Sequence, residues 1–125
     1  VIPSKFRKEL QQGCVVTKGL DNCLQILTKK NWNQESEKMA SLPSTDKTSR
    51  QLRRALFSGA VDSSLDSAGR IQIPENLRAY SAIKENDDVT VTGSGPVIEI
   101  WATKTWKKIQ SDSDDAFANI NEVKG

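Results

Sequence analysis

The sequence predicts a mainly β fold with pseudo-twofold symmetry, built from two tandem repeats, with helices between the repeats and at the C-terminus. Two alignments support this prediction: residues 1–7 match residues 72–78, and residues 15–32 match residues 89–106 at a constant offset. Each copy also contains two β-prone runs separated by turn residues and followed by a helical pattern. Such self-similarity indicates one structural unit that occurs twice.

The alignments divide the chain into a first repeat at 1–32, a helical insert at 33–59, a second repeat at 60–106 and a C-terminal helix or tail at 107–125. A chain of 125 residues buries roughly two thirds of the surface that its unfolded form exposes, so we expect both repeats to share one core. The second repeat carries residues 65–71, whose counterpart in the first repeat would precede Val1. We therefore expect the first repeat to lack its N-terminal segment.

The strands are predicted from short runs rich in β-branched residues. In the first repeat, residues 14–17 and 23–27 flank a segment with Gly, Asp and Asn, which predicts a hairpin. The second repeat has the same pattern at 89–92 and 97–101, around a Gly-Ser-Gly-Pro turn. A further short strand is predicted at 71–73.

Prolines and capping residues predict where the helices begin. Pro3 and Pro74 fit the first position of a helix, so we expect a short helix after each of them. Four apolar residues should turn these helices toward the core: Phe6, Leu10, Leu77 and Tyr80.

Three longer helices follow from similar signals. Thr28 should start a helix that reaches about Ser41, and Ser44 or Thr45 should cap the next one, which ends near Phe57. The last helix should start at Thr103 or Thr105. We expect weak structure after Gln110, where three aspartates lie close together.

Composition excludes several classes of function. The chain has no His and only two cysteines, Cys14 and Cys23, so a Cys/His zinc site within one chain is excluded and no cofactor is expected. The same lack of His removes the commonest general base, and no pair of carboxylates is placed for acid and base roles, so an enzyme is the weakest interpretation.

No apolar run approaches the roughly 20 residues that cross a bilayer. We expect a cytoplasmic protein without a membrane partner.

The loop from Asp66 to Arg70 is the segment most suited to binding. Asp and Arg lie at its two ends, with Ser67 and Gly69 between them. One interpretation is a plain turn, in which Gly69 has a positive φ, Asp66 accepts backbone N–H groups and Arg70 is solvated. The other is a nucleic-acid contact, in which Arg70 reaches base edges or phosphates and Asp66 orients its guanidinium.

A resemblance to a known family favours the second interpretation. Four segments, in order along nearly the whole chain, look like the MraZ family: residues 15–24 (VVTKGLDNCL), 57–60 (FSGA), 65–78 (LDSAGRIQIPENLR) and 98–101 (IEIW). MraZ proteins resemble the AbrB and SpoVT regulators in fold, which implies a swapped-hairpin (double-split) β-barrel made from the two repeats. They are bacterial, nucleoid-associated transcription regulators that bind repeated boxes in double-stranded promoter DNA ahead of the division and cell-wall gene cluster, and they assemble into homo-oligomeric rings.

The resemblance implies that an Asp-x-x-x-Arg loop in each half contacts DNA. In the second half it corresponds to Asp66, Ser67, Gly69 and Arg70; in the first half its counterpart would precede Val1. Lys5, Arg7 and Lys8 flank the position of the missing loop and are candidates for auxiliary phosphate contacts, although a solvated side chain is the favoured interpretation of each one. Arg78 is a further secondary, weaker candidate.

Two further interpretations stay open. The basic helix with Lys47, Arg50, Arg53 and Arg54 could contact phosphates, but we favour an interface or a solvated face as its explanation. The alternative for the whole protein is a β-barrel that binds other proteins, and the net charge of +2 fits this alternative no worse than DNA binding. A partner that survives nuclease treatment, together with no binding to any DNA, would identify that alternative.

Overall fold

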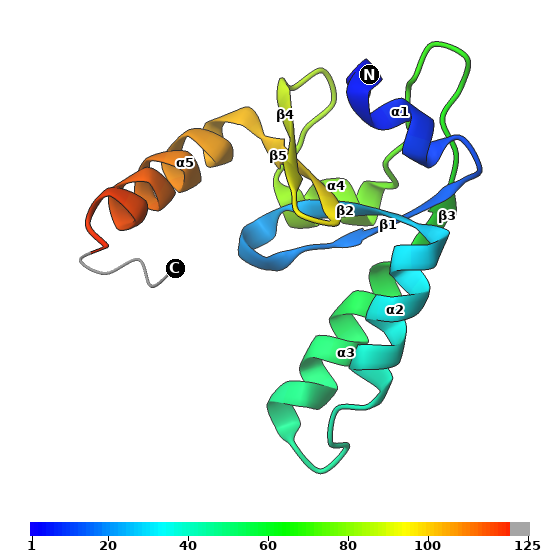
Figure 1. The fold of residues 1–125 in the computed structure, drawn as a ribbon, viewed down its shortest axis with the longest axis vertical. Helices are drawn as coiled ribbons and strands as arrows, with labels where there is room; N and C mark the ends of the chain where they lie inside the picture. Colours follow the sequence, from blue (N-terminus) through cyan, green and yellow to red (C-terminus); the bar gives the residue numbers. More distant parts are fainter. Residues whose placement is uncertain (121–125) are drawn as a thin grey trace.

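The computed structural model describes residues 1–120, which form five strands in one sheet together with several helices (Figure 1). The elements are, in order, α1 (Ser4–Leu10), β1 (Cys14–Lys18), the 3-10 turn η1 (Leu20–Asn22), β2 (Leu24–Thr28), α2 (Lys29–Ala40), α3 (Lys47–Gly59), β3 (Val61–Ser63), α4 (Glu75–Ser81), β4 (Val89–Ser94), β5 (Val97–Ala102) and α5 (Thr103–Ala118). Among these helices, none has both the length and the apolar character needed to span a bilayer.

The order of elements repeats. The first half runs α1, β1, β2, α2 and the second runs α4, β4, β5, α5, with α3 and β3 between them. Both hairpins and both short helices after proline lie where the sequence predicts them. Pro3 and Pro74 are the residues that directly precede α1 and α4. Their fixed φ and missing N–H are compatible with a helix start and not with its interior.

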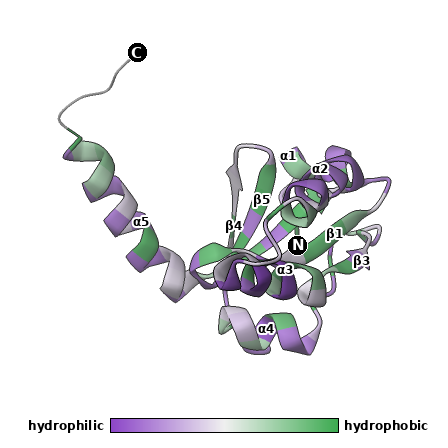
Figure 2. Cartoon of the chain, turned by 90° about the horizontal axis from the view of Figure 1, so that it is seen from below, coloured by the Kyte–Doolittle hydropathy of each residue, from purple (hydrophilic) through white to green (hydrophobic). Residues whose placement is uncertain are grey.

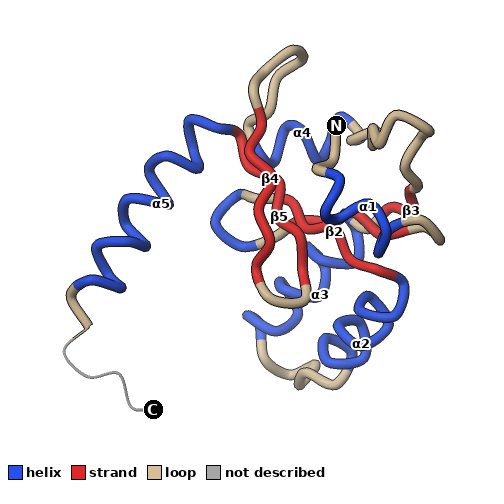
Figure 3. The backbone as a smooth tube through the Cα atoms, turned by 45° about the horizontal axis from the view of Figure 1, so that its top comes forward, coloured by secondary structure: helices blue, strands red, loops and turns tan. Residues whose placement is uncertain are grey.

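The sheet has the strand order β3-β1-β2-β5-β4, and every pair is antiparallel. Its strands are the red segments of Figure 3. The two repeats meet where β2 pairs with β5. At the centre of this pairing Gln25 lies opposite Glu99, its equivalent in the sequence alignment. An antiparallel pair of equivalent residues is related by a local twofold axis, so the pseudo-symmetry of the fold passes through this point.

The sheet is open, which differs from the closed swapped-hairpin barrel that the resemblance implies. In residues 1–120 the edge strands β3 and β4 lie at opposite ends of the strand order and do not pair with each other. β3 lies at the start of the second repeat but pairs with β1 of the first, with Val61 opposite Val16. Closure would require the outer edge of β4 to find a further strand.

The core lies between the sheet and the two short helices. It takes every second residue of the strands, as alternation of side chains in a strand requires. Leu10 of α1 and Leu77 of α4 are both fully buried against this face. The cluster contains Ile2, Leu10, Cys14, Val16, Leu24, Ile26, Leu77, Ile98 and Ile100, and Phe6 and Tyr80 pack at its margin as predicted.

The two cysteines are buried and free, as small apolar residues of a core. Cys14 belongs to the core cluster, and the Cys23 Sγ lies 3.8 Å from the Glu99 Oε2. Burial, with the Glu99 carboxylate beside it, raises the pKa of the Cys23 thiol to about 12. A thiol that stays protonated is a poor nucleophile and metal ligand.

Helices α2 and α3 form a hairpin that extends from the sheet (Figure 1). Trp32 and Phe57 pack edge to face between them, with ring centroids 5.8 Å apart. The hairpin is joined to the sheet by the buried Thr17, whose hydroxyl donates to the Leu56 carbonyl at 2.7 Å.

The capping residues are partly as predicted. Thr28 caps α2, because its Oγ1 accepts a hydrogen bond from the Asn31 N–H at 3.1 Å. The prediction of Ser44 or Thr45 as the cap of α3 is wrong. Asp46 is the cap, and its carboxylate accepts from both the N–H and the hydroxyl of Ser49.

Two other predictions of local structure are also wrong. Residues 71–73 form no strand; Ile71 and Ile73 pack against the core cluster instead, and no strand of the sheet pairs with them. The segment after Gln110 is helical through Ala118, because α5 continues across the aspartates. Residues 121–125 of the predicted tail lie outside the described residues.

Candidate nucleic-acid interface

The predicted binding loop projects from the body between β3 and α4, beside the N-terminal helix α1 (Figure 1). Its two arms are held down by apolar side chains. Leu65 before the turn and Ile71 after it both pack against the core cluster. Between these anchors every residue is exposed except Gly69, which is buried.

The turn itself is tight. The Asp66 N–H donates to the Arg70 carbonyl at 2.9 Å, and the Gly69 N–H donates to the Asp66 carbonyl at 3.0 Å. Gly69 has a φ of +77°, as the sequence predicts, in a region that side chains with a Cβ rarely adopt. These bonds close the loop on itself, so its conformation does not depend on a bound partner.

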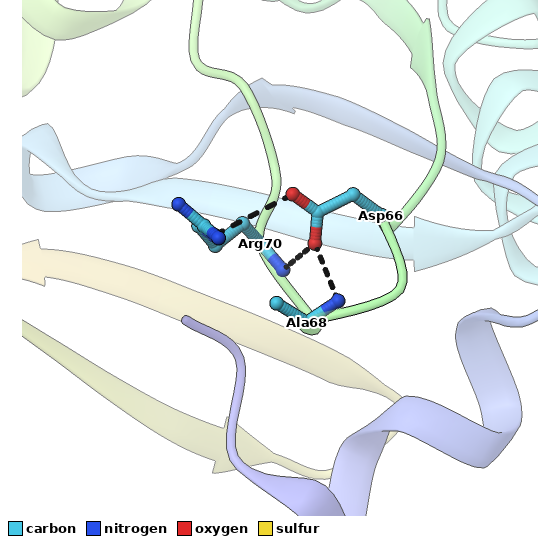
Figure 4. A network of polar contacts seen from close by, with 3 residues as sticks. All are labelled: Asp66, Ala68 and Arg70. Carbon is cyan, nitrogen blue, oxygen red and sulfur yellow. Dashed lines mark hydrogen bonds and ion pairs between the residues drawn. The ribbon is translucent and has the colours of Figure 1, made fainter.

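The Asp66 carboxylate braces the turn from within (Figure 4). Its Oδ1 accepts hydrogen bonds from the N–H groups of Ala68 and Arg70, both at 2.9 Å. These bonds, above all the one from the Arg70 N–H, hold the pKa of Asp66 below that of an ordinary aspartate. The carboxylate is therefore charged at neutral pH.

The Arg70 side chain is paired with Asp66 through its Nε and is otherwise largely exposed. Its Nε lies 3.5 Å from the Asp66 Oδ2, while the side chain remains 68% exposed. Within residues 1–120 this is the only ion pair that the guanidinium makes. The two terminal amino groups thus stay available for a planar acceptor, such as a guanine edge or a phosphate.

Of the secondary residues, Arg7 is brought to the loop. The Ile2 N–H donates to the Gly69 carbonyl at 2.7 Å, and the Arg7 Nε donates to the Ile2 carbonyl at 2.7 Å. A Cβ placed on Gly69 would overlap the Arg7 guanidinium, so the two residues are in direct contact. The sequence gives no local signal for this contact between residues so far apart in the chain.

Lys5 and Arg78 are not part of this cluster. Lys5 lies two residues before Arg7 in α1 and is exposed, with its Nζ 5.0 Å from the centre of the Phe6 ring. Arg78 lines a surface depression at the base of the loop with residues such as Asp62 and Gln72, and its buried Nε has no hydrogen-bond partner among the described residues. The site thus centres on Asp66, Arg70 and Arg7.

Some of the basic side chains of α3 bind backbone carbonyls in the connection between α2 and α3. The Arg50 Nη1 donates to the Ser44 carbonyl at 2.9 Å, and the Arg53 Nη1 reaches the Leu42 carbonyl at 3.4 Å. Two of its four cations therefore hold the connection between α2 and α3. This fits a structural role for that face better than a phosphate site.

The fold and the site together define a class of protein. It is a β protein of two repeats with flanking helices, and an exposed turn carries an arginine whose neighbouring aspartate fixes the backbone of that turn. The family model described as "MraZ protein, putative antitoxin-like" matches the chain twice, over residues 1–55 and 56–123. The chain belongs to the MraZ family. This is a family of regulators associated with the division gene cluster and not a known family of enzymes.

Proposed function

We propose that this protein is a sequence-specific DNA-binding transcription regulator of the bacterial division and cell-wall gene cluster, and that the loop from Asp66 to Arg70 reads its promoter boxes. One observation carries the proposal. Arg70 is 68% exposed at the end of a turn whose backbone is fixed by Asp66. Arg paired in a bidentate manner with the O6 and N7 of guanine is the commonest specific contact to DNA.

A rigid turn favours this use of arginine. Binding a flexible loop costs the entropy of ordering it, and here internal hydrogen bonds have already ordered the backbone. The Ser67 hydroxyl at the exposed tip can donate to a phosphate, while Gly69, which is buried against Arg7, supplies the positive φ that shapes the turn. Arg7 adds a second cation beside the loop, while Lys5 and Arg78 would contact phosphates farther from it.

We also propose that the protein acts as a homo-oligomeric ring on the nucleoid. A single small loop offers few base contacts, so its affinity for one box is low. A ring that places several loops on repeated boxes gains affinity by raising the effective concentration of each later contact. The spacing of the boxes then becomes part of the recognised signal.

The proposal is tested by titrating labelled duplexes that carry one, two or four promoter boxes, and a scrambled duplex of equal length, over a series of salt concentrations. We expect affinity to rise steeply with the number of boxes and to fall with salt, since phosphate contacts release counterions. The scrambled duplex should bind more weakly at every salt concentration. Equal affinity for box and scrambled DNA would refute sequence-specific recognition.

A further inference from the structure

A group of lysines lies on the side of the molecule where the binding loop begins. The C-terminal end of α1, the loop arm that leaves β3 and the start of α2 are found on this side (Figures 1 and 3). Lys8 of α1 and Lys29 and Lys30 of α2 line one surface depression. All three lysines are exposed. The fold thus brings cations from two helices to one place.

Lys29 lies at the base of the loop. A Cβ placed on Gly13 would lie 3.6 Å from the Lys29 Nζ and 3.7 Å from the carbonyl oxygen of Ser63. Ser63 is the last residue of β3, and the first arm of the loop starts directly after it. The ammonium group of Lys29 is therefore close to the point where the chain leaves the sheet toward Asp66.

Lys8 is connected to the loop through its neighbour in α1. Arg7 precedes it in the chain, and the Arg7 guanidinium lies against Gly69. Both residues belong to the last turn of α1. A basic surface therefore runs from the loop across α1 to the depression that Lys8 shares with the start of α2.

The positive charge of this depression is not neutralised by neighbouring acids. Within residues 1–120 the only ion pair joins Arg70 to Asp66, so none of the three lysines has a carboxylate within 4.0 Å. Glu9 also lines the depression, and it is exposed. Three cations and one solvated carboxylate leave a surface that attracts anions.

The position of two of these lysines lowers the stability of α2. Lys29 and Lys30 are its first two residues, where the helix dipole is positive, and its first turn contains no acidic residue. Helix α2 is hydrophilic over most of its length (Figure 2), so its solvation does not depend on them. A polyanion beside the lysines would remove this cost.

On the basis of the proposed function, we propose that Lys8, Lys29 and Lys30 bind backbone phosphates of the DNA next to the box that the Arg70 loop reads. A lysine ammonium binds phosphate as a point charge, and a phosphate contact carries no sequence information. The three lysines therefore supply affinity and position the loop on the duplex, while Arg70 supplies selectivity. Arg7 joins the two parts into one surface.

A double variant, Lys29→Gln with Lys30→Gln, tests the contact in titrations of the box and scrambled duplexes between about 50 and about 200 mM salt. Each lost phosphate contact lowers the slope of log affinity against log salt by about 0.9, so we expect the slope to fall by about 2. Over this range the natural chain should lose about tenfold more affinity than the variant. Both duplexes should weaken by the same factor, which leaves the discrimination between them unchanged.

A matched control carries Lys38→Gln and Lys84→Gln, which change the net charge equally at exposed positions outside the depression. Its salt slope should equal that of the natural chain. The double variant should also keep or gain helicity by circular dichroism, because it removes cations from the positive end of α2.

Two results would refute the lysine contact and leave the Arg70 loop in place. One is an unchanged salt slope in the Lys29 and Lys30 variant while the natural chain discriminates between the duplexes. The other is an equal fall of the slope in the control, which would show a general effect of net charge. If the natural chain binds neither duplex, the proposed function and the lysine contact are both wrong.

Discussion

Asp66 fixes the Arg70 loop through backbone hydrogen bonds more than through its ion pair with Arg70. The two N–H bonds to Oδ1 measure 2.9 Å, whereas the Arg70 Nε is 3.5 Å from Oδ2 and both side chains are largely exposed. Exposed ion pairs contribute little, and hydrogen bonds to a charged acceptor contribute more. The carboxylate therefore shapes the backbone, and the guanidinium keeps its freedom to bind.

This arrangement predicts how the loop responds to acid. The pKa of Asp66 is lowered in the folded loop, so its stabilising bonds are present above the ordinary pKa of an aspartate and are lost as pH falls through the lowered value. In an NMR titration the amide signals of Ala68 and Arg70 should shift only below about pH 4. Asp66→Asn, which keeps the acceptor oxygen, should remove the titration. Shifts centred above pH 4 in the natural chain would contradict this account.

Gly69 and Gly95 offer a matched test of the contact with Arg7. Both have positive φ, at +77° and +62°, but an added Cβ meets the Arg7 guanidinium only at Gly69 and meets nothing at Gly95. Gly95→Ala should cost roughly 1–2 kcal/mol of stability, from the backbone alone. Gly69→Ala should cost clearly more in urea unfolding.

The excess at Gly69 should disappear when Arg7 is also replaced by Ala, as a double-mutant cycle would measure. Equal costs for Gly69→Ala and Gly95→Ala in the natural background would show that Arg7 does not press on the loop. The Ile2–Gly69 hydrogen bond would then be what holds the loop to the N-terminal segment.

Among the elements, helix starts follow local chemistry most closely. The proline-led helices α1 and α4 and the Thr28 cap could be predicted because each depends on one residue and its neighbours. The cap of α3 could not be predicted in this way, because Ser44, Thr45 and Asp46 are all good capping residues. Only the tertiary path of the α2–α3 connection decides among them.

The caps give a prediction with internal controls. Thr28→Ala and Asp46→Ala should each cost about 1 kcal/mol, because each removes an acceptor from a helix N-terminus. Ser44→Ala and Thr45→Ala should each change stability by less than about 0.5 kcal/mol. Thermal unfolding of the four variants measures the difference, and a larger loss at Ser44 or Thr45 than at Asp46 would contradict the observed cap.

The residues after the binding loop show where pattern fails. Ile71 and Ile73 alternate with polar residues as in a strand, yet they serve as apolar anchors and no strand pairs with them. The aspartates after Gln110 indicate weak structure, yet α5 continues through them. In both places the local sequence indicates only whether a residue is apolar or polar. The secondary structure depends on which backbone groups are available as hydrogen-bond partners.

For the whole molecule, the repeat was the most informative signal. It predicted two equivalent hairpins, and these meet with Gln25 opposite Glu99 on a local twofold axis. The pairing of β3 with β1 was beyond the sequence, because a strand of three residues carries almost no pattern. Whether the sheet closes was equally hidden, since closure depends on partners for the edge strands.

A buried hydrogen bond helps to join the helical hairpin to the sheet. Thr17 is fully buried, and its hydroxyl donates to the Leu56 carbonyl. Thr17→Val keeps the shape but leaves that carbonyl without the bond, so we expect a loss of about 1–3 kcal/mol in chemical denaturation. Thr92→Val, on a half-exposed position of β4, should change stability by less than about 0.5 kcal/mol. Similar losses at the two sites would show that the Thr17 bond contributes little.

The central claim is that Arg70 reads a base pair in the promoter boxes. The most direct measurement compares the affinities of the natural chain, Arg70→Ala and Lys38→Ala for box and scrambled duplexes by fluorescence anisotropy at one fixed salt concentration. Arg70→Ala should lose about 1–3 kcal/mol of discrimination between the two duplexes. Lys38→Ala, which removes an exposed cation from α2, should leave discrimination unchanged. Undiminished discrimination by Arg70→Ala would contradict the claim.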